Sequence, residues 1–299
     1  MIVYDHIASN KRKTALLLGA FLLLIIFLGF SFSQAYQAPE ILYFAVGFSI
    51  LYALLSYYFS ANITLAISRA RQVDRQSAPE LYKLVENLAI TAGLPTPKIY
   101  LIEDTATNAF ATGRNPQSAV IVFTTGILQK LTKPELEGVA AHELSHVGNY
   151  DIRLMTLVVV LAGVLTLLAD FFLRFSFYGG KGRSREGGQA QAAFMLVGLL
   201  LALLSPLIAT LIQLAVSRKR EFLADSSGVL LTRYPEGLAS ALEKISRDTE
   251  PLEAANKATA HLYITNPLKN RHGGVGWFAG LFNTHPPIAE RIKRLREMT

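Results

Sequence analysis

The chain has 299 residues, of which 51% are hydrophobic and 17% are charged, with a formal net charge of +7 and no cysteine. Such an apolar composition excludes an ordinary soluble protein of this length and predicts an integral membrane protein. The absence of cysteine excludes a cysteine-ligated structural metal site and fits a cytosol-facing region that needs no disulfides.

Four apolar stretches are long enough to cross a bilayer, which takes about 20 helical residues. We expect transmembrane helices at 14–32, 41–58, 155–173 and 194–216. A cleaved signal peptide is the alternative for the first stretch, but its apolar core is long and a second span follows at once. The third and fourth stretches either cross the membrane or form a hydrophobic hairpin packed partly on the protein.

Basic residues flank the first two spans on one side and are missing from the loop 33–40 between them. They are Lys11, Arg12, Lys13, Arg69, Arg71 and Arg75. This asymmetry predicts that both termini and the region around residue 142 face the cytoplasm, although the loop between the last two spans is also basic. Because the positive charge lies at span ends, we expect it to meet the lipid bilayer and predict no nucleic-acid partner.

The segment between the second and third spans predicts a small α+β unit. Pro79 opens an amphipathic helix, and 98–103 and 118–124 are typical of short strands. The stretch 108–111 forms either a connecting loop or an exposed edge strand, and an edge strand can bind an extended peptide.

Residues 142–146 read His-Glu-Leu-Ser-His. On a helix, His142 and His146 stand one turn apart on one face, as a pair of Zn²⁺ ligands requires. Glu143 is placed to act as general base on a water molecule. A capping box at Thr132–Glu135 and an apolar stripe predict such a helix. The alternative is a polar helix whose histidines face solvent.

A zinc protease needs three protein ligands, and without cysteine the third must be His, Asp or Glu. Glu221 is the best candidate, and Asp225, one helical turn further, is expected to accept a ring N–H of a ligating histidine. The alternative is a solvated charged patch at the membrane edge. Two crossings between His146 and Glu221 return the chain to the side it left, so the three ligands can meet.

The chain after Glu221 predicts a helix over 235–247, a segment 273–278 that either packs or lines a substrate groove, and a basic amphipathic helix over 288–298. His285 precedes two prolines, which hold it rigidly. It is a candidate donor to a developing oxyanion, against the structural role usual for a lone histidine.

Together these features resemble the HtpX family of membrane zinc metalloproteases over essentially the whole chain. The stretches that carry the resemblance are His142–His146 with Asn149 and Asp151, Arg218-x-x-Glu221-Phe222-x-Ala224-Asp225, Asn108-Ala109-Phe110 and Thr284-His285-Pro286-Pro287. The wider gluzincin superfamily, which contains the CAAX prenyl proteases, shares the site.

The resemblance implies one zinc ion and seven site residues. They are the zinc ligands His142, His146 and Glu221, the general base Glu143, the supporting carboxylate Asp225, and Asn108 and His285, which stabilise the oxyanion and hold the substrate backbone. It also implies an endopeptidase of the plasma (inner) membrane that takes part in the stress response. Its partners are misfolded or damaged membrane proteins, unfolded polypeptides and other quality-control proteases.

We therefore predict a mainly α-helical membrane protein with a small α+β zincin-like catalytic domain. Its parts are a membrane hairpin at 1–60, a first catalytic part at 61–151, a second membrane hairpin at 152–216 and a second catalytic part at 217–299.

Three other functions fit parts of the pattern. A CAAX prenyl-protein processing protease needs a chamber built from more than four spans. A site-2-type protease carries its zinc motif inside a span, whereas polar residues surround this one. A non-catalytic membrane adaptor does not need a complete set of ligands and base.

Overall fold

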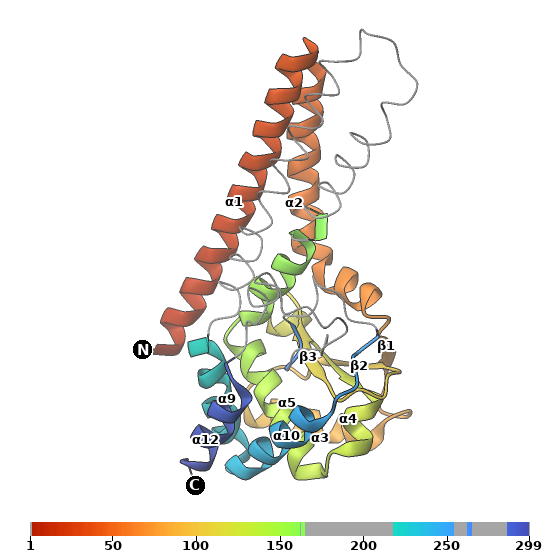
Figure 1. The fold of residues 1–299 in the computed structure, drawn as a ribbon, viewed down its shortest axis with the longest axis vertical. Helices are drawn as coiled ribbons and strands as arrows, with labels where there is room; N and C mark the ends of the chain where they lie inside the picture. The colour runs from red at the N-terminus through yellow and green to blue at the C-terminus, as the bar shows by residue number, and fades with distance from the viewer. Residues whose placement is uncertain (1, 162, 165–217, 254–261, 265–285, 299) are drawn as a thin grey trace.

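Two long helices form a hairpin that projects from a mixed helix-and-sheet unit (Figure 1). They are α1 (Ile2–Tyr36) and α2 (Glu40–Ile67). The computed structural model describes residues 2–161, 163–164, 218–253, 262–264 and 286–298. Within these residues, two helices, Ile7–Gln34 and Glu40–Ile67, are long and apolar enough to cross a membrane. They contain the first two predicted spans. The fourth predicted span and most of the third lie outside the described residues.

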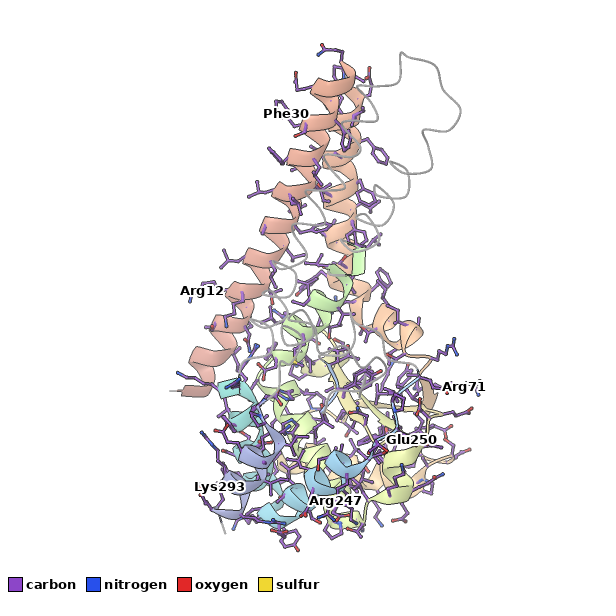
Figure 2. The ribbon with its side chains drawn as sticks, in the orientation of Figure 1. Arg12, Phe30, Arg71, Arg247, Glu250 and Lys293 are labelled. Carbon is purple, nitrogen blue, oxygen red and sulfur yellow. The ribbon has the colours of Figure 1, made fainter. Side chains whose placement is uncertain are left out.

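The outer surface of the hairpin is apolar. Phe44, Tyr43 and Leu23 are 74%, 73% and 71% exposed, as lipid-facing side chains would be. Figure 2 labels Phe30 high on the hairpin and Arg12 lower on α1, whereas the other labelled charged residues, Arg71, Arg247, Glu250 and Lys293, lie on the mixed unit. Exposed apolar side chains on the hairpin and charged side chains on the mixed unit indicate a membrane anchor and a water-exposed part.

A third helical segment packs against the base of the hairpin. Residues 151–161 and 163–164 are helical and leave the mixed unit in the direction of the hairpin (Figure 1). Leu157 and Leu161 pack with Phe21 of α1 and Ala45 of α2 in one buried cluster. The described start of the third predicted span is therefore helical and joined to the hairpin.

The mixed unit contains a four-stranded sheet in the order β1-β2-β4-β3. Its strands are β1 (Arg71–Val73), β2 (Lys98–Ile102), β3 (Ala109–Thr112) and β4 (Val120–Thr124). β2 and β4 are parallel, and the other two pairings are antiparallel. The predicted strands at 98–103 and 118–124 are confirmed as β2 and β4.

β3 is an edge strand, as one of the two alternatives for 108–111 predicted, but it is not exposed. All four of its residues are buried. The backbone N–H of Ile264 donates to the Ala109 carbonyl at 3.1 Å, and α5 packs on the strand. Residues more than 140 positions later in the chain thus cover an edge that local pattern leaves open.

Six further described helices belong to the mixed unit. They are α3 (Pro79–Thr91), α4 (Thr125–Lys130), α5 (Lys133–Gly148), α9 (Arg218–Thr232), α10 (Pro235–Arg247) and α12 (Ile288–Arg296). The predicted helix starts at Pro79 and Pro235 are confirmed. The backbone N–H of Thr132 donates to Glu135 Oε2 at 2.7 Å, the acidic arm of the predicted capping box. Helix α5 is central, because it contacts α3, α9, α10 and β3.

Candidate metal centre

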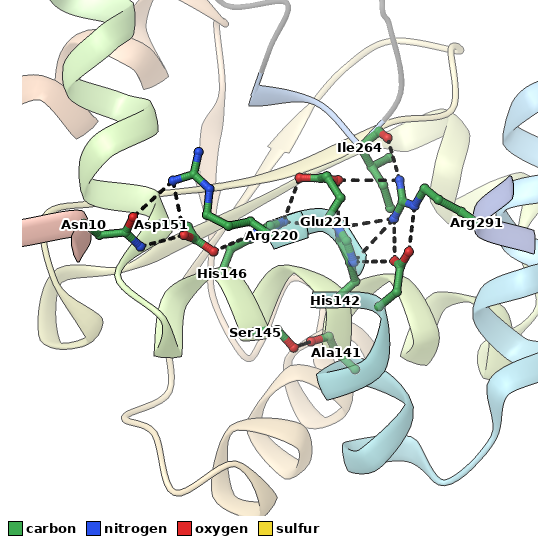
Figure 3. A network of polar contacts seen from close by, with 11 residues as sticks. Asn10, Ala141, His142, Ser145, His146, Asp151, Arg220, Glu221, Ile264 and Arg291 are labelled. Atoms are coloured by element: carbon green, nitrogen blue, oxygen red, sulfur yellow. Dashed lines mark hydrogen bonds and ion pairs between the residues drawn. The ribbon is translucent and has the colours of Figure 1, made fainter. Parts of the chain in front are cut away.

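Helices α5 and α9 bring the three predicted metal ligands together. His142 Nε2 and His146 Nε2 lie 3.2 Å apart at one face of α5. Glu221, in the first turn of α9, places Oε1 3.5 Å from His146 Nε2 and Oε2 3.8 Å from His142 Nε2. Figure 3 shows these three side chains facing one another at the centre of a polar network.

The spacing of these atoms fits a four-coordinate metal. A tetrahedral zinc site with bonds of about 2.0–2.1 Å holds its ligand atoms roughly 3.3–3.4 Å apart. The three residues, all buried, offer ligand atoms within 4.8 Å of one another. Two imidazoles and one carboxylate leave a fourth position for water or substrate, which is the arrangement of catalytic zinc sites.

The Nδ1 atom of each histidine lies within hydrogen-bond distance of a carboxylate. His142 Nδ1 lies 3.0 Å from Asp225 Oδ1, and His146 Nδ1 lies 3.0 Å from Asp151 Oδ2. Each Nδ1 therefore donates, which leaves the lone pair of each Nε2 directed at the other ring across the site. In the neutral form of both rings, the two Nε2 lone pairs can bind one shared cation.

Charge balance favours a divalent cation at this point. Among the described buried residues around the site, four carboxyl groups face two guanidinium groups, so acidic groups outnumber the guanidinium groups. The residues are Glu143, Asp151, Glu221, Asp225, Arg220 and Arg291. Burial lowers the pKa of His146, but the hydrogen bond with Asp151 and the charge of Glu221 outweigh it and raise that pKa to about 9. The surroundings thus stabilise a positive charge where the metal would lie.

A small residue lets the two ligand-bearing helices approach closely. A Cβ atom added to Gly228 on α9 would lie 3.1 Å from the backbone nitrogen of His142. Such a contact is tighter than ordinary van der Waals packing, so a larger side chain would push α9 away from α5. Glu221 and Asp225 lie on the same helix, and their reach to the histidines depends on this crossing.

Glu143, the predicted base, lies beside the three candidate ligands. It is buried, and its carboxylate accepts a hydrogen bond from the backbone of Ala111 on β3. Burial raises the pKa of Glu143 to about 7, with Glu221 adding to the effect. A carboxyl with a pKa near neutral can both accept and return a proton.

Arg291 is a site residue that the sequence reasoning missed. Its Nε and a terminal nitrogen donate to the two oxygens of Asp225 at 2.9 and 2.6 Å, and another terminal nitrogen lies 3.7 Å from Glu221 Oε2. The available signal was position: Arg291 shares the inward face of α12 with Ile288, Ile292 and Leu295, where a charge needs a buried partner.

Three further residues support His146. Asp151 accepts from Asn10 Nδ2 at 2.7 Å and lies 3.5 Å from a terminal nitrogen of Arg220. The same nitrogen of Arg220 donates to Asn10 Oδ1 at 3.1 Å. Asp151 had been quoted as part of the family resemblance without a role. Asn10 gave no signal, because it lies 141 positions from its partner at the start of a membrane helix.

Of the two residues predicted to stabilise the oxyanion, the structure describes only Asn108. Asn108 is buried directly before β3, where its Oδ1 accepts from the Ala109 N–H at 3.1 Å and its own N–H donates to Thr124 Oγ1 at 3.0 Å. His285 and the segment 273–278 lie outside the described residues.

Comparison with known proteins agrees with this site. The family model of peptidase family M48 matches residues 75–299. The protease HtpX homolog of Dictyoglomus turgidum is 44% identical over 299 residues, covering 99% of this chain and 94% of that protein. The homolog of Streptococcus uberis is 41% identical over 305 residues, covering 99% of this chain and all of that protein.

A solved structure shares the fold. The crystal structure of Ste24p from S. mikatae aligns with a TM-score of 0.50 at 21% identity, covering 98% of this chain and 67% of that one. At this identity the likeness shows the fold alone. The family match, the relatives and the buried His-His-Glu group lead to one conclusion: the chain belongs to peptidase family M48 and is a membrane-bound metalloprotease similar to the HtpX proteases.

Proposed function

We propose that this chain is a zinc-dependent endopeptidase that cuts misfolded or damaged membrane proteins at the cytoplasmic face of the plasma membrane. The observation that carries the proposal is the buried group of His142, His146 and Glu221 with Glu143 beside it. Imidazole and carboxylate ligands suit Zn²⁺, and the spacing of the donor atoms fits a tetrahedral ion.

Different residues of the chain have separate roles in hydrolysis. When bound, Zn²⁺ supplies a Lewis acid that polarises the scissile carbonyl and lowers the pKa of water. Asp225 and Asp151 accept from Nδ1 of His142 and His146 and so orient both rings, with Nε2 turned toward the metal position. Glu143 takes the proton of the attacking water and then delivers it to the leaving amide nitrogen.

We assign substrate binding to the edge of the sheet. An extended peptide can add as a strand along β3, using its outward backbone groups. The Ile264–Ala109 hydrogen bond occupies one of these groups and would open as the peptide enters. Asn108, directly before β3, and His285 are assigned to hold the substrate backbone and stabilise the oxyanion.

The test of the mechanism is Glu143→Gln in the full-length protein. We expect the variant to retain its metal and lose casein cleavage by about 10²–10⁴-fold, the usual contribution of a positioned base. The control is Glu137→Gln, the same substitution elsewhere on α5, which should cleave at the wild-type rate. Wild-type cleavage by Glu143→Gln would remove Glu143 from the role of base.

The test of the orientation uses the absence of native cysteine. Single reporters at Gln37→Cys, in the turn of the hairpin, and Glu80→Cys, on the exposed side of α3, are treated with a membrane-impermeant maleimide on intact cells. We expect only the Gln37 reporter to react before lysis. Reaction of the Glu80 reporter in intact cells would place the catalytic unit outside.

A further inference from the structure

We propose that Asn10, on the first membrane helix, is a positioning residue of the metal centre. It fixes the Asp151 carboxylate that orients His146, and it joins the two chain segments that carry the metal ligands. This inference rests on the proposed zinc function. It makes helix α1 part of the support of the active site in addition to its role as an anchor.

Asn10 is buried, and both ends of its side-chain amide are hydrogen-bonded. Its side chain lies within a residue that is 2% exposed, whereas the next two residues, Lys11 and Arg12, are exposed. Nδ2 donates to Asp151 Oδ1 at 2.7 Å and to the Asn149 carbonyl at 3.1 Å. Oδ1 accepts from Arg220 at 3.1 Å. Since burying an unsatisfied amide is costly, these three bonds define the conformation of the side chain.

The Asp151 carboxylate passes this constraint to the metal centre. One oxygen is held by Asn10, and the other lies 3.0 Å from His146 Nδ1 (Figure 3). Arg220 also lies 3.5 Å from the oxygen that Asn10 binds, but the bond from Asn10 is the shorter at 2.7 Å. By holding this oxygen, Asn10 restricts rotation of the carboxylate and keeps Nε2 of His146 directed at the metal position.

Asn10 also reaches the third ligand through the backbone of α9. Arg220, which donates to Asn10, is the residue directly before Glu221. A single amide therefore bridges the partner of His146 on one side and the neighbour of Glu221 on the other. These two segments are separated by about seventy residues of chain, and α1 contributes the group that ties them at this point.

The experiment measures release of Zn²⁺ from the full-length protein in detergent, followed with a chromophoric chelator. Asn10→Leu removes the amide at similar size, and Asn62→Leu, at an exposed position on α2, is the matched control. We expect Asn10→Leu to release zinc roughly 5- to 50-fold faster than wild type, since supporting partners of metal ligands typically change affinity by 10- to 100-fold. The control should release zinc at the wild-type rate.

A double-mutant comparison distinguishes positioning from packing. If Asn10 acts on His146 through Asp151, the effects of Asn10→Leu and Asp151→Ala on zinc release should combine to less than their product in the double variant. Multiplied effects in the double variant would overturn the proposal. Asn10→Asp serves as a second variant that keeps the volume but turns a second carboxylate toward Asp151, and it should also release zinc faster. Wild-type release from Asn10→Asp would mean that only the volume of Asn10 matters.

Failure of the metal assignment itself gives a different result. If wild-type protein holds no stoichiometric zinc, the proposed function is wrong. If wild type holds zinc and Asn10→Leu releases it at the same rate, the metal centre stands and the role of Asn10 is wrong.

Discussion

The two histidines of the metal centre are supported from opposite sides of the site (Figure 3). His142 is held by Asp225. Arg291, also in the water-exposed unit, donates two hydrogen bonds to that carboxylate. His146 is held by Asp151, whose partner Asn10 comes from the membrane hairpin. A paired guanidinium–carboxylate contact is stronger and more directional than an amide–carboxylate contact. Asp151 also has a guanidinium neighbour, but Arg220 lies 3.5 Å away and makes no paired contact. We therefore expect the His142 side to be the more rigid half of the site and the His146 side to depend on the membrane helix.

The largest expected effect comes from breaking the rigid half. Arg291 is 0% exposed, so Arg291→Leu leaves the Asp225 carboxylate buried without its main partner. Removing one member of a buried ion pair typically costs about 3–5 kcal/mol. We expect a comparable loss in the free energy of unfolding, measured in detergent by thermal or denaturant unfolding. The control is the exposed Arg294→Leu on the same helix, and equal losses in the two variants would contradict the comparison.

Smaller effects should follow when each supporting carboxylate is changed alone. Asp225→Asn and Asp151→Asn keep the size of the side chain and remove the charge that orients each histidine. Each should weaken zinc binding by about 10- to 100-fold, measured by competition with a chelator of known affinity. An unchanged zinc affinity in either variant would mean that its histidine is held by other contacts.

An ion pair between the buried Glu135, in the first turn of α5, and the partly exposed Lys244 of α10 tests stability apart from metal binding. Burial raises the pKa of Glu135, but hydrogen bonds from Lys244 and Ser240 outweigh it and lower that pKa from 4.5 to about 2. The folded pKa lies below the unfolded one, so the stabilisation is full above pH 4.5 and is lost as the pH falls toward 2.

We therefore expect Glu135→Gln to lower the free energy of unfolding by about 2–3 kcal/mol at pH 7, with zinc affinity unchanged. The difference from wild type should shrink when unfolding is measured at pH 3.5. A difference that stays constant between pH 7 and pH 3.5 would show that the charge of Glu135 is not its source.

The smallest expected effect comes from an exposed ion pair, which serves as the reference for the other variants. Arg71 and Glu103 form an ion pair whose side chains are 77% and 73% exposed. Exposed pairs contribute little because water and salt screen them. Arg71→Ala should change neither zinc affinity nor, within about 0.5 kcal/mol, the free energy of unfolding. A larger loss in a chemical denaturation curve would mean that β1 does more than cover the sheet edge.

The local parts of the site could be predicted from the sequence, because they depend on helical spacing. His142 and His146 share one face of α5, and Glu221 and Asp225 share one face of α9, as their four-residue intervals predict. The meeting of the two helices was expected from a count of membrane crossings. The fourth predicted span and most of the third lie outside the described residues, so that count stays a prediction. The helix starts followed from proline and the capping box.

The long-range supports could not be predicted in the same way. Asn10 and Asp151 are 141 positions apart, and Arg291 and Asp225 are 66 positions apart, so no periodic pattern links them. The three-residue strand β1 is too short to show alternation. The cover over β3 comes from Ile264, which only the tertiary fold brings to the edge of the sheet.

The most direct test of the metal centre is X-ray absorption spectroscopy of zinc in the full-length Glu143→Gln protein, compared with Glu221→Ala. We predict one zinc per chain with two imidazole nitrogens and a carboxylate oxygen at about 2.0–2.2 Å, and loss of stoichiometric zinc in Glu221→Ala. An identical spectrum and full occupancy in Glu221→Ala, or a spectrum without imidazole scattering, would contradict the account.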